Sequence, residues 1–289
     1  MTTGWGAQSM VAPLRRVLLV RPVPPPNPDS WRDFGYLHPI DDERAAAEHA
    51  ALVTLLEREG IETIVVEPED PALQDAIFPF DPVLVTSAGA ILLRMGKELR
   101  QPEVAALEQV LRRLGIPIVG RIQSPGTVEG GDCLWLDEQT LIVGRSYRTN
   151  DTGIAQLADL LRPQAVQVIA VDLPHWHGPG ECLHLLSLLS PVDTDLIVAY
   201  LPLLPVRLAE MLVDRRIEII TVPEDEFATQ APNVLALAPR RCVILKENQR
   251  TIAALERAGC TVFVYDGQEI SHNRSGGPTC LTRPLLRSW

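Results

Sequence analysis

Short apolar runs and amphipathic helical stretches alternate along the chain in a pattern that recurs five times. Each repeat has an apolar run, a helical stretch and a second apolar run, with a period of about 50 residues, a spacing typical of propellers, solenoids and arrays. The leading runs are Arg16–Val20, Ala90–Arg94, Thr140–Gly144, Asp195–Tyr200 and Arg241–Lys246. The trailing runs are Ile61–Val66, Ile116–Val119, Val166–Val171, Ile217–Val222 and Cys260–Tyr265.

The runs are short, β-branched and apolar on both faces, which is typical of strands buried between a core and covering helices. The intervening stretches carry apolar residues at helical spacing, and Gly60 and Gly115 end the first two. The predicted helices are Glu43–Glu59, Glu103–Leu114, Ile154–Leu161, Val206–Val213 and Ile252–Ala258. The pattern predicts an α/β fold of five strand–helix–strand units around one axis, forming a single domain over residues 1–289.

Two segments fall outside the repeat. Residues 1–14 are expected to be a loose N-terminal leader. Val20–Ser30 is rich in proline, which lacks an N–H and fixes φ, so it is predicted to be a long loop and a candidate lid. Trp31, Phe34 and Tyr36 follow it, and this aromatic cluster either closes over a ligand or pins the loop down.

The charge and the cysteines narrow the class of protein. A formal net charge of −11 argues against a nucleic-acid partner and fits either a cationic small ligand or simple solubility. The chain lacks an apolar run of about 18 residues and a secretory leader, so neither a membrane span nor secretion is expected. The five scattered cysteines do not suggest a disulfide framework, and we predict a reduced, cytoplasmic protein.

Polar residues of chemical interest stand just before the leading runs. Asp81 precedes the second run, Glu129 and Asp132 the third, and His184 the fourth, while Cys280 follows the last unit. If the units close around an axis, these positions converge at one end of it. The segment PGTVEGGD places two glycines between Glu129 and Asp132, so the backbone there can approach a ligand closely, although an acidic surface turn has the same pattern.

The histidine-rich segment DLPHWHGPGECLHL supports two interpretations. His175, His177, Cys182 and His184 are possible zinc ligands, but their spacing matches no standard zinc site, and we predict no metal and no cofactor. His184 lies between two leucines, which is also typical of a core histidine. Cys280 follows two glycines that leave its thiol approachable, so it is either a buried structural cysteine or a nucleophile with His184 as its base.

Taken together, one cysteine, one histidine and several carboxylates favour a particular substrate chemistry. A protease needs only one orienting acid. Carboxylates bind a planar guanidinium in a bidentate manner, and a thiolate can attack its central carbon. The set therefore indicates an arginine-like small molecule.

At these residues the chain resembles the guanidino-group-modifying superfamily, the penteins, and within it most closely dimethylarginine dimethylaminohydrolase, with arginine deiminases and amidinotransferases as relatives. The resemblance covers nearly the whole chain and implies a five-bladed α/β propeller, in agreement with the repeat. The matching segments are FDPVLVTS (Phe80–Ser87), PGTVEGGD (Pro125–Asp132), VGRSYRTN (Val143–Asn150), LHL (Leu183–Leu185) and GGPTC (Gly276–Cys280).

The resemblance also implies a role for each matching residue. Cys280 corresponds to the nucleophile, His184 to the general acid and base, and Glu129 to the carboxylate that orients the histidine. Asp81 corresponds to the carboxylate that grips the guanidinium. The other implied substrate contacts are Arg100 and Arg148 at the α-carboxylate, Asp75 near the α-amino group and Trp31 in the lid.

The implied reaction is hydrolysis of an Nω-methylated arginine to citrulline and an amine through a covalent thiouronium on Cys280. Phe80 stands where these enzymes usually carry a charged residue, so the exact substrate stays open. Leu186 replaces an aspartate of the arginine deiminase pattern, which argues against a plain deiminase. The alternatives are an amidinotransferase, which passes the adduct to an amine, and a non-catalytic binding protein. A homodimer is one oligomeric state considered for this chain.

Overall fold

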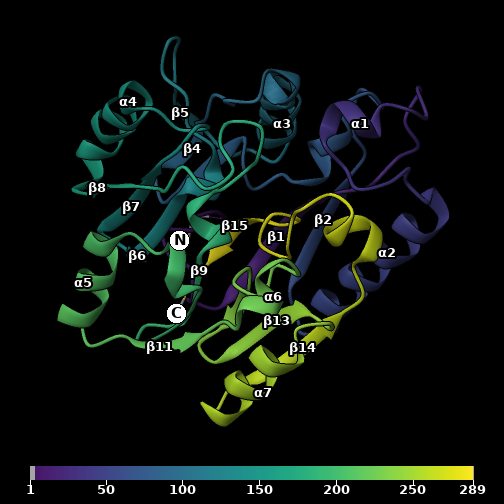
Figure 1. Cartoon of the computed structure of the whole chain (residues 1–289). Coiled ribbons are helices and arrows are strands. Elements are labelled where there is room, and N and C mark those ends of the chain that lie inside the picture. The colour runs from purple at the N-terminus through teal and green to yellow at the C-terminus, as the bar shows by residue number, and fades with distance from the viewer. Residues whose placement is uncertain (1–3, 289) are drawn as a thin grey trace.

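The computed structural model describes residues 4–288 and shows five three-stranded sheets set as blades around one axis (Figure 1). The inner strands are β3 (Val83–Thr86), β6 (Cys133–Asp137), β9 (Leu189–Asp193), β12 (Leu235–Ala238) and β15 (Arg283–Arg287). The middle strands are β1 (Leu14–Val20), β4 (Gly89–Leu92), β7 (Thr140–Arg145), β10 (Leu196–Ala199) and β13 (Arg241–Leu245). The outer strands are β2 (Glu62–Val66), β5 (Ile118–Arg121), β8 (Gln167–Asp172), β11 (Glu218–Thr221) and β14 (Thr261–Tyr265).

Every blade has the same internal order. The inner strand pairs antiparallel with the middle strand, and the middle strand pairs parallel with the outer strand. A parallel pair needs a crossover connection, which explains why a helix lies between each middle and outer strand. The predicted leading and trailing runs are these middle and outer strands, so the five-fold repeat is confirmed. The inner strands were not predicted as separate elements.

One blade joins the two ends of the chain. Its inner strand β15 comes from the C-terminal region and pairs with β1, with Leu18 opposite Arg283 and Leu14 opposite Arg287. The ring is therefore closed by main-chain hydrogen bonds between segments that are more than 250 residues apart, since the strands begin at 14 and 283.

Helices cover the outside of the ring (Figure 1). The crossover helices are α2 (Asp42–Arg58), α3 (Gln101–Arg113), α4 (Asp151–Leu161), α5 (Val206–Asp214) and α7 (Gln249–Arg257), close to the predicted bounds. The carboxylate of Asp41 accepts a hydrogen bond from the Arg44 N–H and caps α2. The short helices α1 (Trp31–Phe34) and α6 (Glu224–Phe227) were not predicted. Further single turns occupy Gln74–Ile77, Glu98–Arg100, Gly130–Asp132, Arg162–Gln164, Leu185–Ser187, Leu201–Leu203 and Gln268–His272.

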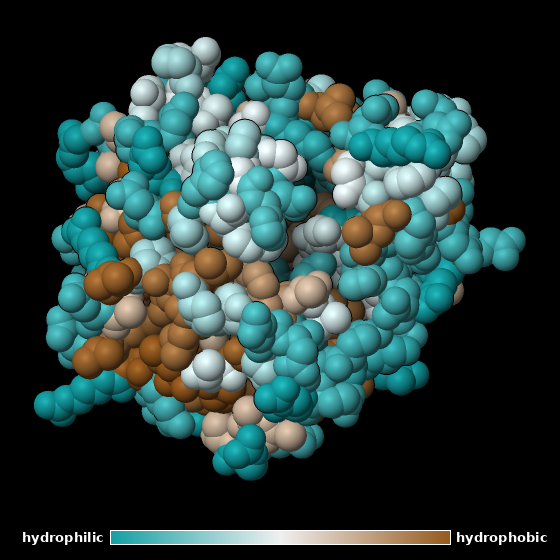
Figure 2. Space-filling view, viewed as in Figure 1, coloured by the Kyte–Doolittle hydropathy of each residue, from teal (hydrophilic) through white to brown (hydrophobic). Residues whose placement is uncertain are grey.

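The apolar core lies between neighbouring sheets and beneath the helices. Side chains of the middle strands such as Leu18, Ile91 and Ile142 are fully buried. Figure 2 shows one broad apolar area on the viewed face, over α5 and β11, where Val206 and Val213 are 74% and 69% exposed. Within residues 4–288, the helices lack the combination of length and apolar character that a membrane span requires.

The expectation of a loose leader is wrong for the part of it that the structure describes. The Gly6 N–H bonds the Leu285 carbonyl at 2.8 Å, and the Arg287 N–H bonds the Gly6 carbonyl at 2.7 Å. Ala7, Val11 and Ala12 are buried. This segment is ordered because it pairs with the otherwise free edge of the inner strand β15; residues 1–3 lie outside the described residues.

Candidate active site

The loops that enter the inner strands bring one set of polar side chains together at one end of the axis. Each of the five loops contributes at least one member: Asp81 before β3, Glu129 and Asp132 before β6, His184 before β9, Asn233 before β12 and Cys280 before β15. Hydrogen bonds between the loops join His184 to Glu129, Asn233 to Cys280, and Gly131 to Asp81. The predicted convergence of these positions is therefore observed.

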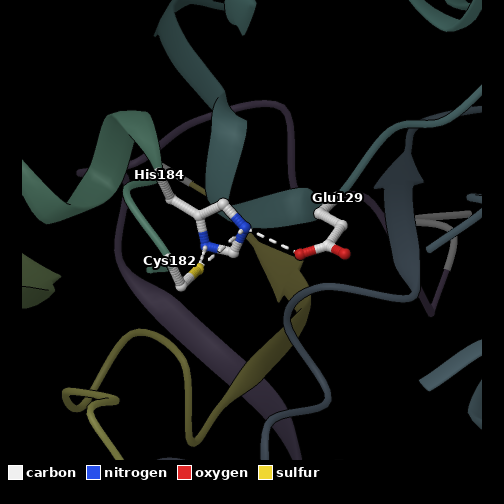
Figure 3. A group of neighbouring side chains, drawn as sticks. All are labelled: Glu129, Cys182 and His184. Atoms are coloured by element: carbon white, nitrogen blue, oxygen red, sulfur yellow. Dashed lines mark hydrogen bonds and ion pairs between the residues drawn. The ribbon is translucent and has the colours of Figure 1, made fainter. Parts of the chain in front are cut away.

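Glu129 and His184 form the centre of this set (Figure 3). Oε2 of Glu129 lies 2.8 Å from Nε2 of His184. The other carboxylate oxygen accepts hydrogen bonds from the N–H groups of Gly96 and Lys97, at 2.9 and 3.1 Å. Burial acts to raise the pKa of Glu129, but the hydrogen bond and charge of His184, with the Arg148 cation, outweigh it and lower the pKa to about 2. Glu129 is thus an ionised partner that fixes the imidazole.

Asp132 holds the backbone that carries His184. Its Oδ1 accepts the Leu185 N–H at 3.0 Å, and its Oδ2 accepts the Ser146 hydroxyl at 2.6 Å. Burial acts to lower the pKa of His184, but the neighbouring Cys182, Asp132 and Asp81 outweigh it and raise the pKa well above the usual value. The imidazole therefore holds a proton at neutral pH that it can deliver.

Two glycines allow the loops to approach so closely. A Cβ at Gly130 would lie 2.1 Å from the Phe80 carbonyl oxygen, and a Cβ at Gly131 would lie 2.3 Å from Nδ1 of His184. The segment EGGD therefore needs both glycines for packing between loops, which is the close-approach interpretation of the sequence.

Cys280 lies half-buried among Asn233, Asp81 and His184. The Asn233 side-chain amide donates to its sulfur at 3.3 Å. Burial raises the pKa of the Cys280 thiol to about 11, and the Asp81 charge adds to this, while His184, the Gly277 N–H and Asn233 act in the opposite direction. The thiol is therefore neutral at physiological pH, chiefly because it is buried and secondly because of the Asp81 charge.

A second cysteine also contacts the imidazole. Sγ of Cys182 lies 3.6 Å from both Nδ1 and Nε2 of His184 (Figure 3). The two ring nitrogens point outward in diverging directions within the ring plane, so an atom equidistant from both is aligned with neither for a hydrogen bond. Cys182 is exposed, whereas Cys280 is half-buried.

Cys182, Glu129 and His184 are also the described residues whose donor atoms could hold a metal, since these atoms lie within 4.8 Å of one another. Neither His175 nor His177 belongs to this group; His175 instead contacts the Tyr147 hydroxyl at 2.6 Å. A cation would have to replace the proton shared by Glu129 and His184, so the arrangement fits an acid–base pair better than the zinc set considered from the sequence.

The guanidinium of Arg100 forms hydrogen bonds with two carboxylates of the protein itself. Its Nη1 donates to Oδ2 of Asp81 at 2.6 Å, and its Nε and Nη2 donate to Glu103 at 3.1 and 2.9 Å. Nη2 also bonds the Phe78 carbonyl, and the residue is 4% exposed. This arrangement differs from the α-carboxylate role that the resemblance implied, because all three nitrogens are already used. Arg100 instead orients Asp81.

Asp75 contacts the candidate lid segment, residues 31–36, which follows the Pro-rich loop. One oxygen of Asp75 accepts the Tyr36 hydroxyl at 2.7 Å, and the other accepts the Lys97 ammonium at 2.8 Å. Lys97 also donates to the Phe34 carbonyl at 3.0 Å and so ties the lid segment to the site. Nη1 of Arg148 lies 3.5 Å from Glu129, and its side chain is 14% exposed.

Phe80 and Trp31 lie outside the polar set. The Phe80 side chain is 3% exposed and packs in the core, with the Arg283 guanidinium 3.8 Å from its ring centroid, and its expected contact with the substrate stays a prediction. Trp31 begins α1 and stacks with Arg32, whose guanidinium carbon is 4.4 Å from the ring centroid. The expected role of Trp31 in a lid stays a prediction.

Sequence reasoning missed two contributors, Asn233 and Lys97. Asn233 stands two residues before β12, the position that Asp81 holds before β3, so the repeat itself was a signal for it. Lys97 follows β4 and carries no comparable signal.

The comparisons agree with this fold. The family model described as "N,N dimethylarginine dimethylhydrolase, eukaryotic" matches residues 31–287. The dimethylarginine dimethylaminohydrolase of Streptomyces coelicolor is 30% identical over 84% of this chain and 86% of its own length. A mutant of the Pseudomonas aeruginosa enzyme complexed with citrulline has a TM-score of 0.79 at 26% identity, covering 96% of this chain and 100% of its own. An amidinotransferase from Microseira wollei shares the fold at 19% identity, with a TM-score of 0.79 over 98% of this chain and 97% of its own.

The fold and site define a pentein, an α/β propeller that modifies guanidino groups. Within that superfamily the chain belongs to the dimethylarginine dimethylaminohydrolase family. It is a cysteine-dependent hydrolase that acts on C–N bonds of amidines.

Proposed function

We propose that this enzyme hydrolyses an Nω-methylated arginine to citrulline and methylamine or dimethylamine, with Cys280 as the nucleophile. The observation that carries the proposal is the gathering of Cys280, Asp81 and the His184–Glu129 pair on loops at one end of the axis. A neutral thiol near a carboxylate is suited to a cationic substrate, because the arriving charge offsets the carboxylate, which adds to burial in keeping the thiol protonated.

In the first half of the reaction the substrate guanidinium pairs with Asp81 and offsets its charge. The Cys280 thiol then releases its proton to solvent water, because His184 is already protonated, and the thiolate forms a C–S bond to the central guanidinium carbon. His184 donates its proton to the departing amine nitrogen as the C–N bond breaks, and Glu129 stabilises the imidazole throughout. The product of this half is a covalent S-alkylthiouronium on Cys280.

In the second half the now neutral His184 removes a proton from water, and the hydroxide oxygen bonds to the same carbon. The tetrahedral intermediate collapses with cleavage of the C–S bond, and its hydroxyl proton passes to the departing sulfur, which restores the Cys280 thiol and releases the neutral ureido product. His184 ends protonated, ready for the next cycle. Asp132 and Gly131 act as positioning residues, since they fix the backbone and the ring of His184.

For the amino-acid end of the substrate we propose Arg148 at the α-carboxylate and Asp75 at the α-amino group. Arg148 has one long ion pair and retains exposure, so it can take a carboxylate. Arg100 is assigned to holding Asp81, because its guanidinium is bonded to Asp81 and Glu103. The lid segment with Trp31 would close over this end.

The test is a product assay with arginine, monomethylarginine, asymmetric dimethylarginine and agmatine supplied separately. Citrulline and dimethylamine from dimethylarginine, abolished in Cys280→Ala, are the expected result. Turnover of another member would change the substrate but keep the mechanism. Product that forms only when an amine acceptor is added would identify an amidinotransferase, and binding with no turnover and no adduct would overturn the enzymatic proposal.

Two further proposals concern the cellular compartment and the oligomeric state of the protein. All five cysteines are free thiols, which supports a reducing compartment such as the cytoplasm. The apolar area on α5 supports a homodimer, which sedimentation analysis would test.

A further inference from the structure

A small cavity on the axis is lined by two buried arginines that the mechanism does not use. The cavity has a volume of about 10 Å³, and its lining includes Arg283 and Arg287 from β15 and Trp135 from β6. The two arginines are 4% and 8% exposed. Their described hydrogen bonds all go to main-chain carbonyls: Arg283 bonds Phe80 and Val83, and Arg287 bonds Ala12 and Ala236.

The polar atoms left without a partner around this cavity are all N–H donors. They are Nε of Arg283, Nε of Arg287 and Nε1 of Trp135. No aspartate or glutamate stands among the described residues that line the cavity. Two buried cations and three unpartnered donors without a carboxylate are costly, because a buried charge needs a counter-charge and a buried donor needs an acceptor.

We propose that this cavity is a binding site for one small monoatomic anion, with chloride as the physiological ligand. Its size is close to that of a single water-sized particle, which excludes phosphate or a carboxylate. A chloride ion accepts hydrogen bonds from several N–H groups at once and supplies the missing negative charge. A water molecule accepts only two hydrogen bonds and carries no charge.

The electrostatics of the two arginines support the same assignment. Burial lowers the pKa of both Arg283 and Arg287 to about 9, and the charge of Arg283 adds to the effect at Arg287. The carboxylate that acts on Arg283 is Asp81, whose own oxygens are bonded to Arg100 and Gly131. Asp81 therefore offsets the charge of Arg283 only in part, and burial outweighs it.

A surface groove of about 640 Å³ lies beside the cavity and shares Ser9, Met10 and Trp135 with its lining. The groove lies between the β6–β7 and β9–β10 turns, away from the loops that carry Cys280 and His184. The shared side chains separate the cavity from the groove, so an anion that enters from this side has to pass them.

The site predicts that chloride binds the folded protein and stabilises it. The melting temperature is measured while sodium gluconate is replaced by sodium chloride at constant ionic strength. We expect a saturable rise, of about 5 °C once chloride exceeds its dissociation constant about 100-fold. Arg283→Met should abolish the chloride dependence, whereas Arg207→Met, at an exposed arginine that bonds the Ala170 carbonyl, should preserve it.

Diffraction from crystals grown in sodium bromide keeps the proposal testable if Arg283→Met does not fold. An anomalous peak between Arg283 and Arg287 is the expected result. Equal melting temperatures in chloride and gluconate, together with density for water at this position, would overturn the proposal.

Discussion

Gly131 and His184 are packed so closely that a Cβ at position 131 would lie 2.3 Å from Nδ1 of the imidazole. In Gly131→Ala the ring must move, and it will lose alignment with Glu129. We expect kcat to fall by a factor of about 10 to 100, since displacements of about 1 Å in an active site cost that much. Gly180→Ala is the control, because a Cβ there meets nothing within 4 Å. An unchanged kcat in Gly131→Ala would show that catalysis does not depend on the exact position of the His184 imidazole.

The two thiols beside His184 are predicted to differ completely in function. Cys280→Ser should lower kcat by about 10³-fold or more, because the nucleophile is replaced by a much weaker one. Cys182→Ser should stay within about threefold of the wild type, since its sulfur is aligned with neither ring nitrogen and Asp132 and Asp81 still raise the pKa of His184. Peptide mapping of the trapped covalent intermediate provides an independent measurement. An adduct on Cys182 would reverse the assignment.

Asp81 is predicted to affect the thiol and the substrate in opposite directions. Its charge contributes to the raised pKa of Cys280, so Asp81→Asn should lower that pKa and increase the thiolate fraction. In a Cys182→Ser background, the alkylation of Cys280 by iodoacetamide at pH 8 should therefore become faster. The same variant should have a higher KM, because the guanidinium loses its counter-charge. Slower alkylation would contradict the proposed role of Asp81 in keeping the thiol neutral.

The depressed pKa of Glu129 predicts a pH-dependent contribution to stability. Its pKa falls from an ordinary 4.5 to about 2 in the folded protein, so its stabilising contribution is complete above pH 4.5 and is lost as the pH falls through 2. The loss relative to Glu129→Gln should be on the order of 3 kcal/mol. Urea unfolding of both proteins between pH 5 and pH 2 measures it. If the free energy of unfolding changes with pH in the same way in both proteins, Glu129 is not held ionised by His184.

Arg148 is predicted to distinguish substrates by their carboxylate. Arg148→Ala should raise KM for methylated arginines about 10- to 100-fold, because a charge-assisted hydrogen bond is lost. It should change KM little for a guanidino amine that lacks the α-carboxylate. Arg145→Ala is the matched control, since Arg145 is exposed and pairs with Asp151. Equal effects on KM for both substrates would show that Arg148 pairs with Glu129 and does not bind the substrate carboxylate.

The strands and helices of the repeat were readable from the sequence because each buries a continuous apolar face. The inner strands were missed for a local reason: Cys133–Asp137 and Thr140–Arg145 are separated by only a tight turn, so the pair resembles one apolar region. The pairing of β15 with β1 has no local signal at all, because it joins the two ends of the chain.

For the candidate site, the sequence predicted which residues take part but not what surrounds each of them. Cys280, His184, Glu129 and Asp81 were accessible because each occupies the same place in successive repeats. The environment of each was not accessible, since it depends on loops from other blades. Arg100 illustrates this: its sequence position matches an arginine that binds substrate, yet Asp81 and Glu103 occupy its guanidinium. Asn233 was available from the repeat and was overlooked because a lone asparagine suggests no chemistry.

The pairing of β15 with β1 places Cys280 on the last piece of the ring to form. A growing polypeptide can complete four blades while it is still attached to the ribosome, but the loop that carries the nucleophile has no strand to hold it until residues 283–287 emerge and reach β1. Catalytic competence therefore requires residues 283–287, and a chain that stops before them leaves the Cys280 loop without the strand that follows it.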